Sequence, residues 1–361
     1  MNLLIDIGHP AHVHLFKDFA ERLRDKGHVV YFSAKQVESI VKLLDVYGYS
    51  YTSLGRKHNG SLLKYLSSSV HLVKLWSLVV SKKIDIGIGV SGLLPFVSGF
   101  SKLKSICLDD DDSVITPLFA RSIRNADAIL TPSALKDDSR GKNHITYNGY
   151  HELAYLHPDQ FKPDPDVLKV LGLKEGEKFF LLRFNAFKAH HDVGEYGLSM
   201  EQKKQLIKLL EPHGRVFVSS EMENMDFADY KINLPPEKIH SLLYYATMFI
   251  GDSQTMTSEA AVLGIPALKC NTFAGRLSIP DELEHKYGLC YSFKPDNFDQ
   301  LLIKAAELLN QETLHEEFHS RRQKMLSEKI NVTAFLEWFI ENFQEGKQIM
   351  KENPDYQYQF K

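Results

Sequence analysis

The sequence has little cysteine, and the little it has argues against a disulfide framework. Its 361 residues include three cysteines, Cys107, Cys270 and Cys290. The number is odd, no pair has Cys-x-x-Cys spacing, and each cysteine lies in an apolar stretch. We therefore expect reduced residues of a hydrophobic core, which is the usual state in a cytoplasmic protein.

An excess of charge of either sign is also absent. The chain has 43 basic and 46 acidic residues, a formal net charge of −3. A nucleic-acid-binding surface would give a clear basic excess, so no nucleic-acid partner is expected. Any phosphate that the protein binds must be held by a local cluster of groups.

Long apolar runs are missing as well. The longest candidate, Val70 to Val80, contains His71 and Lys74 and is too short to span a bilayer. The N-terminus has no basic segment ahead of its first apolar run, so we expect no signal peptide. The amphipathic stretch from Ser61 to Val80 favours a packed helix of the first domain. The alternative is a peripheral contact with the inner face of a membrane.

The length suits two α/β domains, each large enough for its own core. Three prolines between His157 and Pro165 predict a linker over 158–170. This leaves an N-terminal Rossmann-like domain at 1–157, a C-terminal one at 171–330, and a helix and tail at 331–361. Two such domains are expected to face a cleft.

Short apolar runs alternate with stretches of helical periodicity in both halves, which predicts doubly wound parallel sheets of the α/β class. Ligands of such sheets bind beyond the carboxyl ends of the strands, so the loops there are the candidate sites. The expected strands are 3–7, 29–32, 84–90, 105–108 and 128–130 in the first half, and 179–184, 215–219, 248–251 and 267–270 in the second.

The segment from Phe249 to Pro266 is the most informative of these strand–loop–helix units. Its polar turn begins a helix with Ser253 or Thr255 as N-cap, and free N–H groups at a helix start favour phosphate. Glu259, about one turn further in, is placed to reach a ribose. A capping box would need a serine or threonine three residues earlier, where Met256 stands. A role for Glu259 outside the helix is therefore favoured.

Two further loops of the second half carry cations. The loop from Arg183 to Asp192 includes Lys188, and two cations suit a diphosphate. The loop after Cys270 ends at Arg276, which is a candidate for a further clamp. An ordinary surface loop remains the alternative for the loop from Arg183 to Asp192.

In the first half, three histidines lie between His9 and His14, directly after the first strand. A histidine at a helix start is a candidate general base, because its ordinary pKa is near neutrality; His12 comes first, then His14. The alternatives are a metal site, disfavoured because the segment has no cysteine and Pro10 stiffens the loop, and histidines that only cap the helix.

Four consecutive carboxylates, Asp109 to Asp112, follow a later strand. Their mutual repulsion must be offset by solvent, a cation or a proton. The loop is therefore either solvated, or a source of an acid/base group such as Asp110, or a holder of a divalent ion. Further along, Tyr147 to Tyr150 predicts a turn in which Gly149 supplies a positive φ, with a ligand contact as the alternative.

These motifs resemble the glycosyltransferase-B superfamily, in which two Rossmann-like domains hold a nucleotide-sugar. The loop from Asp6 to Val13 is similar to the first loop of the lipid-linked GlcNAc transferase of cell-wall synthesis, with Gly8 on one of its glycines and His12 on its loop histidine. The turn from Asp252 to Glu259 resembles that of the non-hydrolysing UDP-GlcNAc 2-epimerase, whose serine meets phosphate and whose final glutamate meets ribose.

The match to the epimerase turn has departures. Gln254 and Thr255 replace two glycines and Ser258 replaces a first glutamate, while Arg183 falls on the epimerase's arginine after the first strand of its second domain. Over nearly its whole length the chain also resembles an uncharacterised bacterial and archaeal family of this superfamily. The motifs behind that likeness lie at 8–14, 148–157 and 251–259.

The resemblance implies a glycosyltransferase that uses a nucleotide-sugar, most simply a UDP-sugar, and a glycan or lipid-linked acceptor in cell-envelope or polysaccharide synthesis. It implies no metal or other cofactor. The alternatives are a non-hydrolysing UDP-sugar 2-epimerase, with the acidic loop as acid and base, and a non-catalytic sugar-nucleotide or glycan-binding protein. The candidate catalytic residues are His12, His14 and Asp110, and the candidate nucleotide-sugar-binding residues are Gly8, Arg183, Ser253, Gln254, Thr255, Glu259 and Arg276.

Overall fold

The computed structural model describes residues 1–55, 61–174, 176–185, 194–220 and 225–361. The chain divides into two units. Unit 1 comprises Met1–Gln160 and Lys329–Lys361, and unit 2 comprises Phe161–Glu328. The first boundary falls inside the stretch predicted as a linker. The C-terminal segment, expected as a separate helix and tail, is part of unit 1.

Unit 1 is built on a seven-stranded parallel sheet of order β3-β2-β1-β4-β5-β6-β7. Its central strands are apolar and buried on both faces, as parallel strands under helices must be. The order 3-2-1-4-5-6 is that of the Rossmann fold, here with one more strand. The strands are β1 (Asn2–Ile7), β2 (Val29–Lys35), β3 (Tyr51–Gly55), β4 (Ile86–Gly89), β5 (Lys104–Leu108), β6 (Ala128–Pro132) and β7 (His144–Tyr147).

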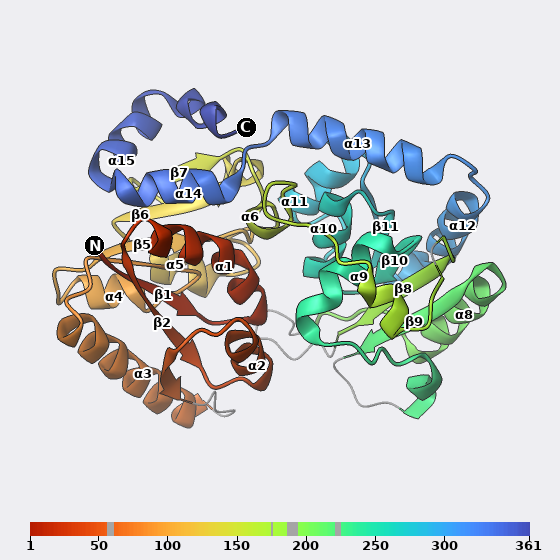
Figure 1. The fold of residues 1–361 in the computed structure, drawn as a ribbon, viewed down its shortest axis with the longest axis horizontal. Coiled ribbons are helices and arrows are strands. Elements are labelled where there is room, and N and C mark those ends of the chain that lie inside the picture. The colour runs from red at the N-terminus through yellow and green to blue at the C-terminus, as the bar shows by residue number, and fades with distance from the viewer. Residues whose placement is uncertain (56–60, 175, 186–193, 221–224) are drawn as a thin grey trace. The chain divides into compact units, whose positions relative to one another are not determined.

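The helices of unit 1 come from both ends of the chain. Figure 1 shows α14 and α15, in blue, against strand β7 of the same unit. The ring of Phe335 on α14 packs on that of Tyr147 at the end of β7, with centroids 5.7 Å apart. The helices are α1 (Pro10–Asp25), α2 (Glu38–Val46), α3 (Ser61–Ser81), α4 (Leu94–Ser98), α5 (Pro117–Ile123), α6 (Leu153–Leu156), α14 (Val332–Glu341) and α15 (Phe343–Glu352).

The prediction for Gly149 is wrong in its physical reason. Gly149 is not among the glycines with positive φ. A Cβ at this position would lie 2.5 Å from Cγ2 of Val332. The glycine is required because the C-terminal segment packs directly on the backbone after β7.

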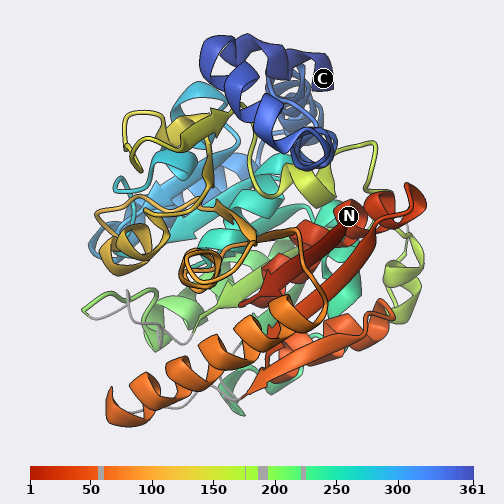
Figure 2. The same ribbon diagram turned by 90° about the vertical axis from the view of Figure 1, so that its left-hand side faces the viewer.

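Helix α3 is the amphipathic stretch of the sequence. Figure 2 shows it in orange alongside the strands of its own unit, and it contacts β3. Leu75, Leu78 and Val79 are buried in the core, while Val73 and Trp76 on the other side are exposed. Among the described residues, no helix is long and apolar enough to cross a membrane.

Unit 2 has a five-stranded parallel sheet of order β12-β11-β10-β8-β9. Numbered within the unit, this is the 2-1-3-4-5 order of flavodoxin-like sheets, with its switch point between β8 and β10. With unit 1 it confirms the predicted class of two doubly wound α/β domains. The strands are β8 (Phe179–Phe184), β9 (Arg215–Ser220), β10 (Met248–Gly251), β11 (Ala267–Cys270) and β12 (Cys290–Phe293).

Two helices of unit 2 begin or end at residues that are typical helix caps. Helix α8 starts at a capping box in which Ser199 and Gln202 satisfy each other's backbone N–H groups. Helix α10 ends at Gly264, which has the left-handed conformation that favours glycine. The helices are α7 (Asp166–Val170), α8 (Met200–Leu210), α9 (Ile239–Tyr245), α10 (Gln254–Leu263), α11 (Ser278–Asp281), α12 (Phe298–Leu309) and α13 (Leu314–Glu328).

Candidate functional site

The strand order places one candidate site at the carboxyl end of β1 in unit 1. There β1 pairs with β2 on one side and with β4 on the other, so the chain leaves the sheet at a topological switch point. Asp6 is the last residue of β1 that pairs with β4, and its carboxylate accepts a hydrogen bond from Ser33 at 2.7 Å. Gly8 and the three histidines follow directly.

The three histidines of this loop have different partners. His9 is the N-cap of α1, and its Nδ1 accepts the N–H of Ala11 at 3.3 Å, so the helix-capping alternative holds for this residue. His14 is buried between aromatic rings, with Nδ1 3.2 Å from the hydroxyl of Tyr47 and its ring 5.8 Å from that of Tyr155. His14, the second candidate base, is thus part of an aromatic cluster with Tyr47 and Tyr155.

His12 is held by the backbone of its own loop. The N–H of Gly8 donates to Nδ1 of His12 at 3.2 Å. A neutral histidine that accepts at Nδ1 carries its proton on Nε2. Burial, followed by the nearby His9, lowers the pKa of His12 to about 3, so the ring is neutral at physiological pH. In this state His12 is a hydrogen-bond donor.

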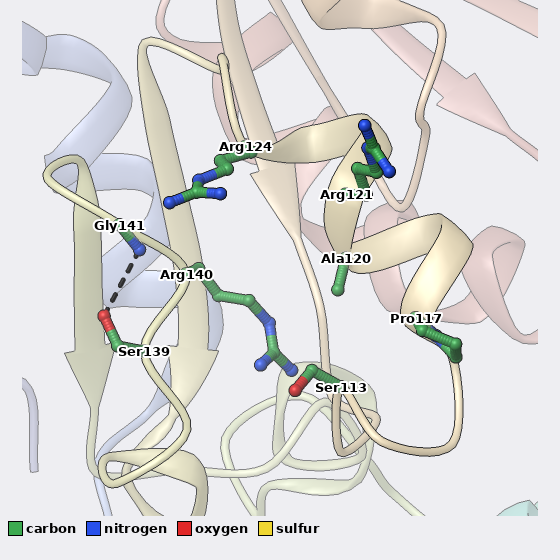
Figure 3. A pocket seen from close by; sticks show the side chains of 8 residues that line it. All are labelled: Ser113, Pro117, Ala120, Arg121, Arg124, Ser139, Arg140 and Gly141. Atoms are coloured by element: carbon green, nitrogen blue, oxygen red, sulfur yellow. Dashed lines mark hydrogen bonds between the residues drawn. The ribbon is translucent and has the colours of Figure 1, made fainter.

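Arg140 neutralises the first carboxylate of the acidic loop. Its Nε donates to Asp109 at 2.9 Å, its Nη1 to Asp138 at 2.7 Å and its Nη2 to the carbonyl of Asp111 at 2.5 Å. Arg140 and Asp109 each have only 1% of the side chain exposed. Figure 3 shows Arg140 reaching toward Ser113, whose N–H and hydroxyl both donate to Asp138.

The second carboxylate, Asp110, is paired with a histidine that the sequence analysis left out. Oδ2 of Asp110 lies 3.1 Å from Nδ1 of His151, which follows β7. Burial pushes the pKa of Asp110 up, but the charge of His151 and its hydrogen bond outweigh burial and lower it. Burial lowers the pKa of His151, but the charge of Asp110 and the hydrogen bond to it outweigh burial and raise it. The ion pair is therefore the favoured state.

For the third carboxyl of the loop, that of Asp111, a bound proton relieves the repulsion between neighbouring carboxylates. Burial, and then the charges of Asp110 and Asp109, raise the pKa of Asp111 to about 8. Burial also raises the pKa of Asp109 to about 6, although Arg140 works against it. The acidic loop thus holds a carboxylate, Asp110, next to a carboxylic acid, Asp111. That combination provides a proton acceptor and a proton donor at one place.

In unit 2 the switch point lies between β8 and β10. Arg183 is the last residue of β8 that pairs with β10, and its carbonyl accepts the N–H of Asp252 at 3.1 Å. The guanidinium of Arg183 donates to Oγ of Ser219 at 2.6 Å. The strand therefore places Arg183 directly beside the turn from Asp252. Lys188, expected to join it, lies outside the described residues.

Asp252 opens this turn and has an unusual environment. Its Oδ1 accepts the N–H of Asn185 at 2.6 Å, while Oδ2 is buried and finds no hydrogen-bond partner in the part of the chain that the structure describes. Burial raises the pKa of this carboxyl to about 7. A Cβ on Gly197 would lie 2.5 Å from Oδ2, so the backbone of Gly197 covers the carboxyl.

Ser253 is the N-cap of α10, and its Oγ accepts the N–H of Met256 at 3.4 Å. Among the described residues, no hydrogen-bond partner is found for the N–H groups of Gln254 and Thr255, which the first turn of a helix leaves without intrahelical acceptors. These two groups and the helix dipole form an anion site of the predicted kind. The side chain of Gln254 accepts from the buried Lys269 at 2.7 Å.

Glu259 lies inside α10 and is paired across to α9. Its Oε1 lies 2.9 Å from Nε2 of His240, and the two side chains are 5% and 7% exposed. Arg276 is more exposed; it pairs with Glu195 at 2.7 Å and covers the ring of Phe273. The structure thus brings Arg183, Ser253, Gln254 and Thr255 to one turn, with Glu259 one helical turn further in.

His151, Asp252 and His240 are members of these clusters that were not predicted from the sequence. His151 stands in a motif that was noted only for its likeness to a family, and Asp252 in one valued for its amides. Among the described residues, no group of three or more His, Cys, Asp or Glu side chains is arranged to hold a metal ion. The three cysteines are free and buried, as predicted.

Solved structures of similar fold include epimerases and glycosyltransferases. Staphylococcus aureus MnaA with UDP is 13% identical, with a TM-score of 0.68 over 95% of this chain and 97% of that one. A UDP-N-acetylglucosamine 2-epimerase is 15% identical, with a TM-score of 0.64 over 96% of each chain. The glycosyltransferase VinC with dTDP is 11% identical, with a TM-score of 0.61 over 96% and 100%. At these identities the likeness shows the fold alone, which is the glycosyltransferase-B fold.

Comparison of sequences gives the family. The uncharacterized protein MJ0665 of Methanocaldococcus jannaschii is 23% identical over 290 residues, which are 75% of this chain and 82% of that protein. The model of the family described as protein of unknown function (DUF354) matches residues 1–313. Because that match spans most of the chain, the protein is a member of this family.

Proposed function

We propose that this protein transfers a sugar from a nucleotide-activated donor to an acceptor hydroxyl. The observation that carries the proposal is the turn between β10 and α10. There the N–H groups of Gln254 and Thr255, for which the described residues provide no acceptor, lie beside the end of β8 and Arg183. An amide pair at a helix start next to an arginine is suited to a diphosphate.

The donor would be held largely by unit 2. The N–H groups of Gln254 and Thr255 take the diphosphate with help from Arg183, and Arg276 assists at the loop after β11. The ribose hydroxyls donate to Glu259, which His240 keeps in place at 2.9 Å. A nucleoside diphosphate is also the ligand in two of the similar structures, with UDP in one and dTDP in the other. This supports a nucleotide-sugar as the donor class.

Charge that develops on the departing diphosphate is offset in this proposal by backbone amides and Arg183, which are fixed before the reaction. The transfer therefore requires no metal ion from the protein. The acceptor hydroxyl must lose a proton, and the acidic loop with its ionised Asp110 is the proposed site of that step. A glycan or lipid-linked acceptor of cell-envelope or polysaccharide synthesis is the proposed class.

One observation favours a second candidate, a non-hydrolysing UDP-sugar 2-epimerase. The loop after β5 holds an ionised carboxylate, Asp110, beside Asp111, whose pKa is raised to about 8. Epimerisation removes a proton from one face of a sugar carbon and returns one to the other, so it requires both an acid and a base.

The test is a binding panel followed by product analysis. The purified protein is titrated in a calorimeter with UDP-, GDP-, dTDP- and CMP-sugars, with the free nucleotides and with inorganic phosphate. Selective binding of one nucleotide class, weakened in Glu259→Gln, supports the donor site. Incubation of that sugar nucleotide without an acceptor then separates the candidates, because only an epimerase produces the epimer. No binding of any nucleotide overturns both.

A further inference from the structure

Within unit 1, His151 has one ring nitrogen bound and the other unsatisfied. Nδ1 lies 3.1 Å from Oδ2 of Asp110, whereas Nε2 is buried and has no hydrogen-bond partner among the described residues. The hydroxyl of Tyr147, four residues earlier, is also buried, and no described residue forms a hydrogen bond with it. Buried polar atoms in native proteins are nearly always satisfied, so two orphans in one short segment indicate a place for a bound polar group.

The hydrogen bonds fix which nitrogen of each histidine can take a proton. Asp110 is ionised and accepts only, so Nδ1 of His151 carries a hydrogen and the lone pair of the neutral ring is on Nε2. His12 has the opposite arrangement, because its Nδ1 accepts from Gly8 and its Nε2 carries the hydrogen. Of these two rings, only that of His151, in its neutral form, presents a lone pair at a nitrogen for which the described residues provide no partner.

We propose that His151 is the catalytic base of this protein and that Asp110 is the positioning residue that orients it. The proposal rests on the function proposed above. It assigns His12 a different role, that of a hydrogen-bond donor from Nε2 to the reacting ligand. The carboxylate–imidazole pair has the geometry by which a base is held in one tautomer and its imidazolium form is stabilised.

The acceptor oxygen bonds to the anomeric carbon of the sugar, and the bond from that carbon to the diphosphate oxygen breaks. The departing nucleoside diphosphate keeps that electron pair. The proton of the acceptor hydroxyl moves to Nε2 of His151, and the imidazolium that forms remains hydrogen-bonded to Asp110 through Nδ1.

The charges around His151 set the pH dependence. Asp110 lies opposite its Nδ1, Glu152 is its neighbour in the chain and Asp109 lies on the acidic loop; all three raise the pKa of His151, against burial. His12 on α1 and Asp111 on the same loop also interact with its charge. Because the base is active only when neutral, turnover rises with pH, with a midpoint above the ordinary histidine pKa of about 6.5.

The experiment uses the full chain and UDP-N-acetylglucosamine, with water as the acceptor, and measures release of UDP from pH 5 to pH 9. In His151→Ala we expect kcat to fall about 10²- to 10⁴-fold, the usual contribution of a general base. The Kd of UDP stays within about twofold of the wild-type value, since unit 2 holds the nucleotide. Added imidazole restores part of the lost kcat, which a merely structural role would not allow.

Two further variants complete the test. In Asp110→Asn the midpoint of the pH profile moves to lower pH, because the carboxylate that raises the pKa of His151 is gone. His157→Gln is the matched control, since His157 is another histidine of unit 1 and pairs instead with Asp159 at 3.4 Å; its kcat and midpoint stay at the wild-type values.

The outcomes separate the inference from the proposed function. If the wild-type protein releases UDP and His151→Ala keeps kcat within a few fold, the inference is wrong and the proposed function stands. The same holds if kcat falls, imidazole restores nothing and Asp110→Asn leaves the midpoint unmoved, since His151 is then only structural. If the wild-type protein binds no nucleotide and releases no UDP, the proposed function fails and the inference fails with it.

Discussion

Replacement of Arg140 by methionine is expected to destabilise unit 1 strongly. Arg140→Met removes the ion pair with Asp109 at 2.9 Å, the pair with Asp138 at 2.7 Å and the bond to the carbonyl of Asp111. It leaves Asp109 buried without its cation. Breaking a buried ion pair by removing one partner costs about 3–5 kcal/mol. At about 2–4 °C per kcal/mol for a unit of this size, the midpoint of unfolding should fall by roughly 6–20 °C.

The cost should depend on pH, with a definite sign. The pKa of Asp109 is about 6 with Arg140 present, and loss of the cation raises it further. At pH 8 the wild-type carboxylate is ionised and paired with Arg140, so the loss of this pair has its largest cost there. Below about pH 6 the carboxyl takes up a proton, and the difference between variant and wild type shrinks.

The assay is differential scanning calorimetry at pH 8 and pH 5, following the transition of unit 1. Arg121→Met is the matched control, because Arg121 lines the same pocket as Arg140 but is exposed (Figure 3). Its stability should change by no more than about 0.5 kcal/mol. Asp109→Asn combined with Arg140→Met should recover part of the loss. Equal transitions for Arg140→Met and Arg121→Met, or a cost that does not change with pH, would refute the reasoning.

Three further predictions concern unit 2. Ser199→Ala removes the N-cap of α8 and should cost about 1 kcal/mol in thermal unfolding while leaving UDP affinity unchanged; a change in affinity would contradict this. The pKa of Asp252 is about 7, so the carboxyl is neutral below that pH and repels a diphosphate above it. Calorimetric affinity for UDP should therefore fall as pH rises through 7, and Asp252→Asn should flatten the dependence; an unchanged slope in the variant would contradict the assignment. Glu259→Gln weakens a charge-assisted bond to ribose and should reduce UDP affinity by roughly 10- to 150-fold, equivalent to about 1.5–3 kcal/mol; His240→Gln, which keeps the carboxylate, should reduce it less, and equal losses would point to a structural role for the pair.

The strands that could be predicted from the sequence are mostly those that consist almost entirely of apolar residues. Strands β1, β4, β8 and β10 are buried on both faces, so the sequence of each is a nearly continuous run of apolar residues. Strands β3, β7 and β12 were missed, and all three are edge strands. An edge strand needs less apolar surface, and the Tyr-Thr-Ser-Leu-Gly sequence of β3 has no run to recognise.

The site was predictable only as far as it is local. Ser253 as an N-cap and the amides after it follow from a contiguous motif, and the structure has them as predicted. The pairs Asp110–His151, Asp109–Arg140 and His240–Glu259 join residues from separate elements. No spacing in the sequence specifies such pairs, because the topology of the sheet brings them together. The role given to Gly149 depended in the same way on Val332, which is distant in the chain. His12 is bound by Gly8 of its own loop, but its neutral state results mainly from burial, which the sequence does not specify.

The account's central claim is that this protein binds a nucleotide-sugar at the turn after β10. Calorimetric titration of the wild-type protein with UDP-N-acetylglucosamine, beside Glu259→Gln and Arg183→Met, tests it most directly. The account predicts saturable binding to the wild-type protein and clearly weaker binding to both variants. Binding that neither substitution weakens would contradict the site. Absence of binding to UDP-N-acetylglucosamine and to the GDP-, dTDP- and CMP-sugars would contradict the claim itself.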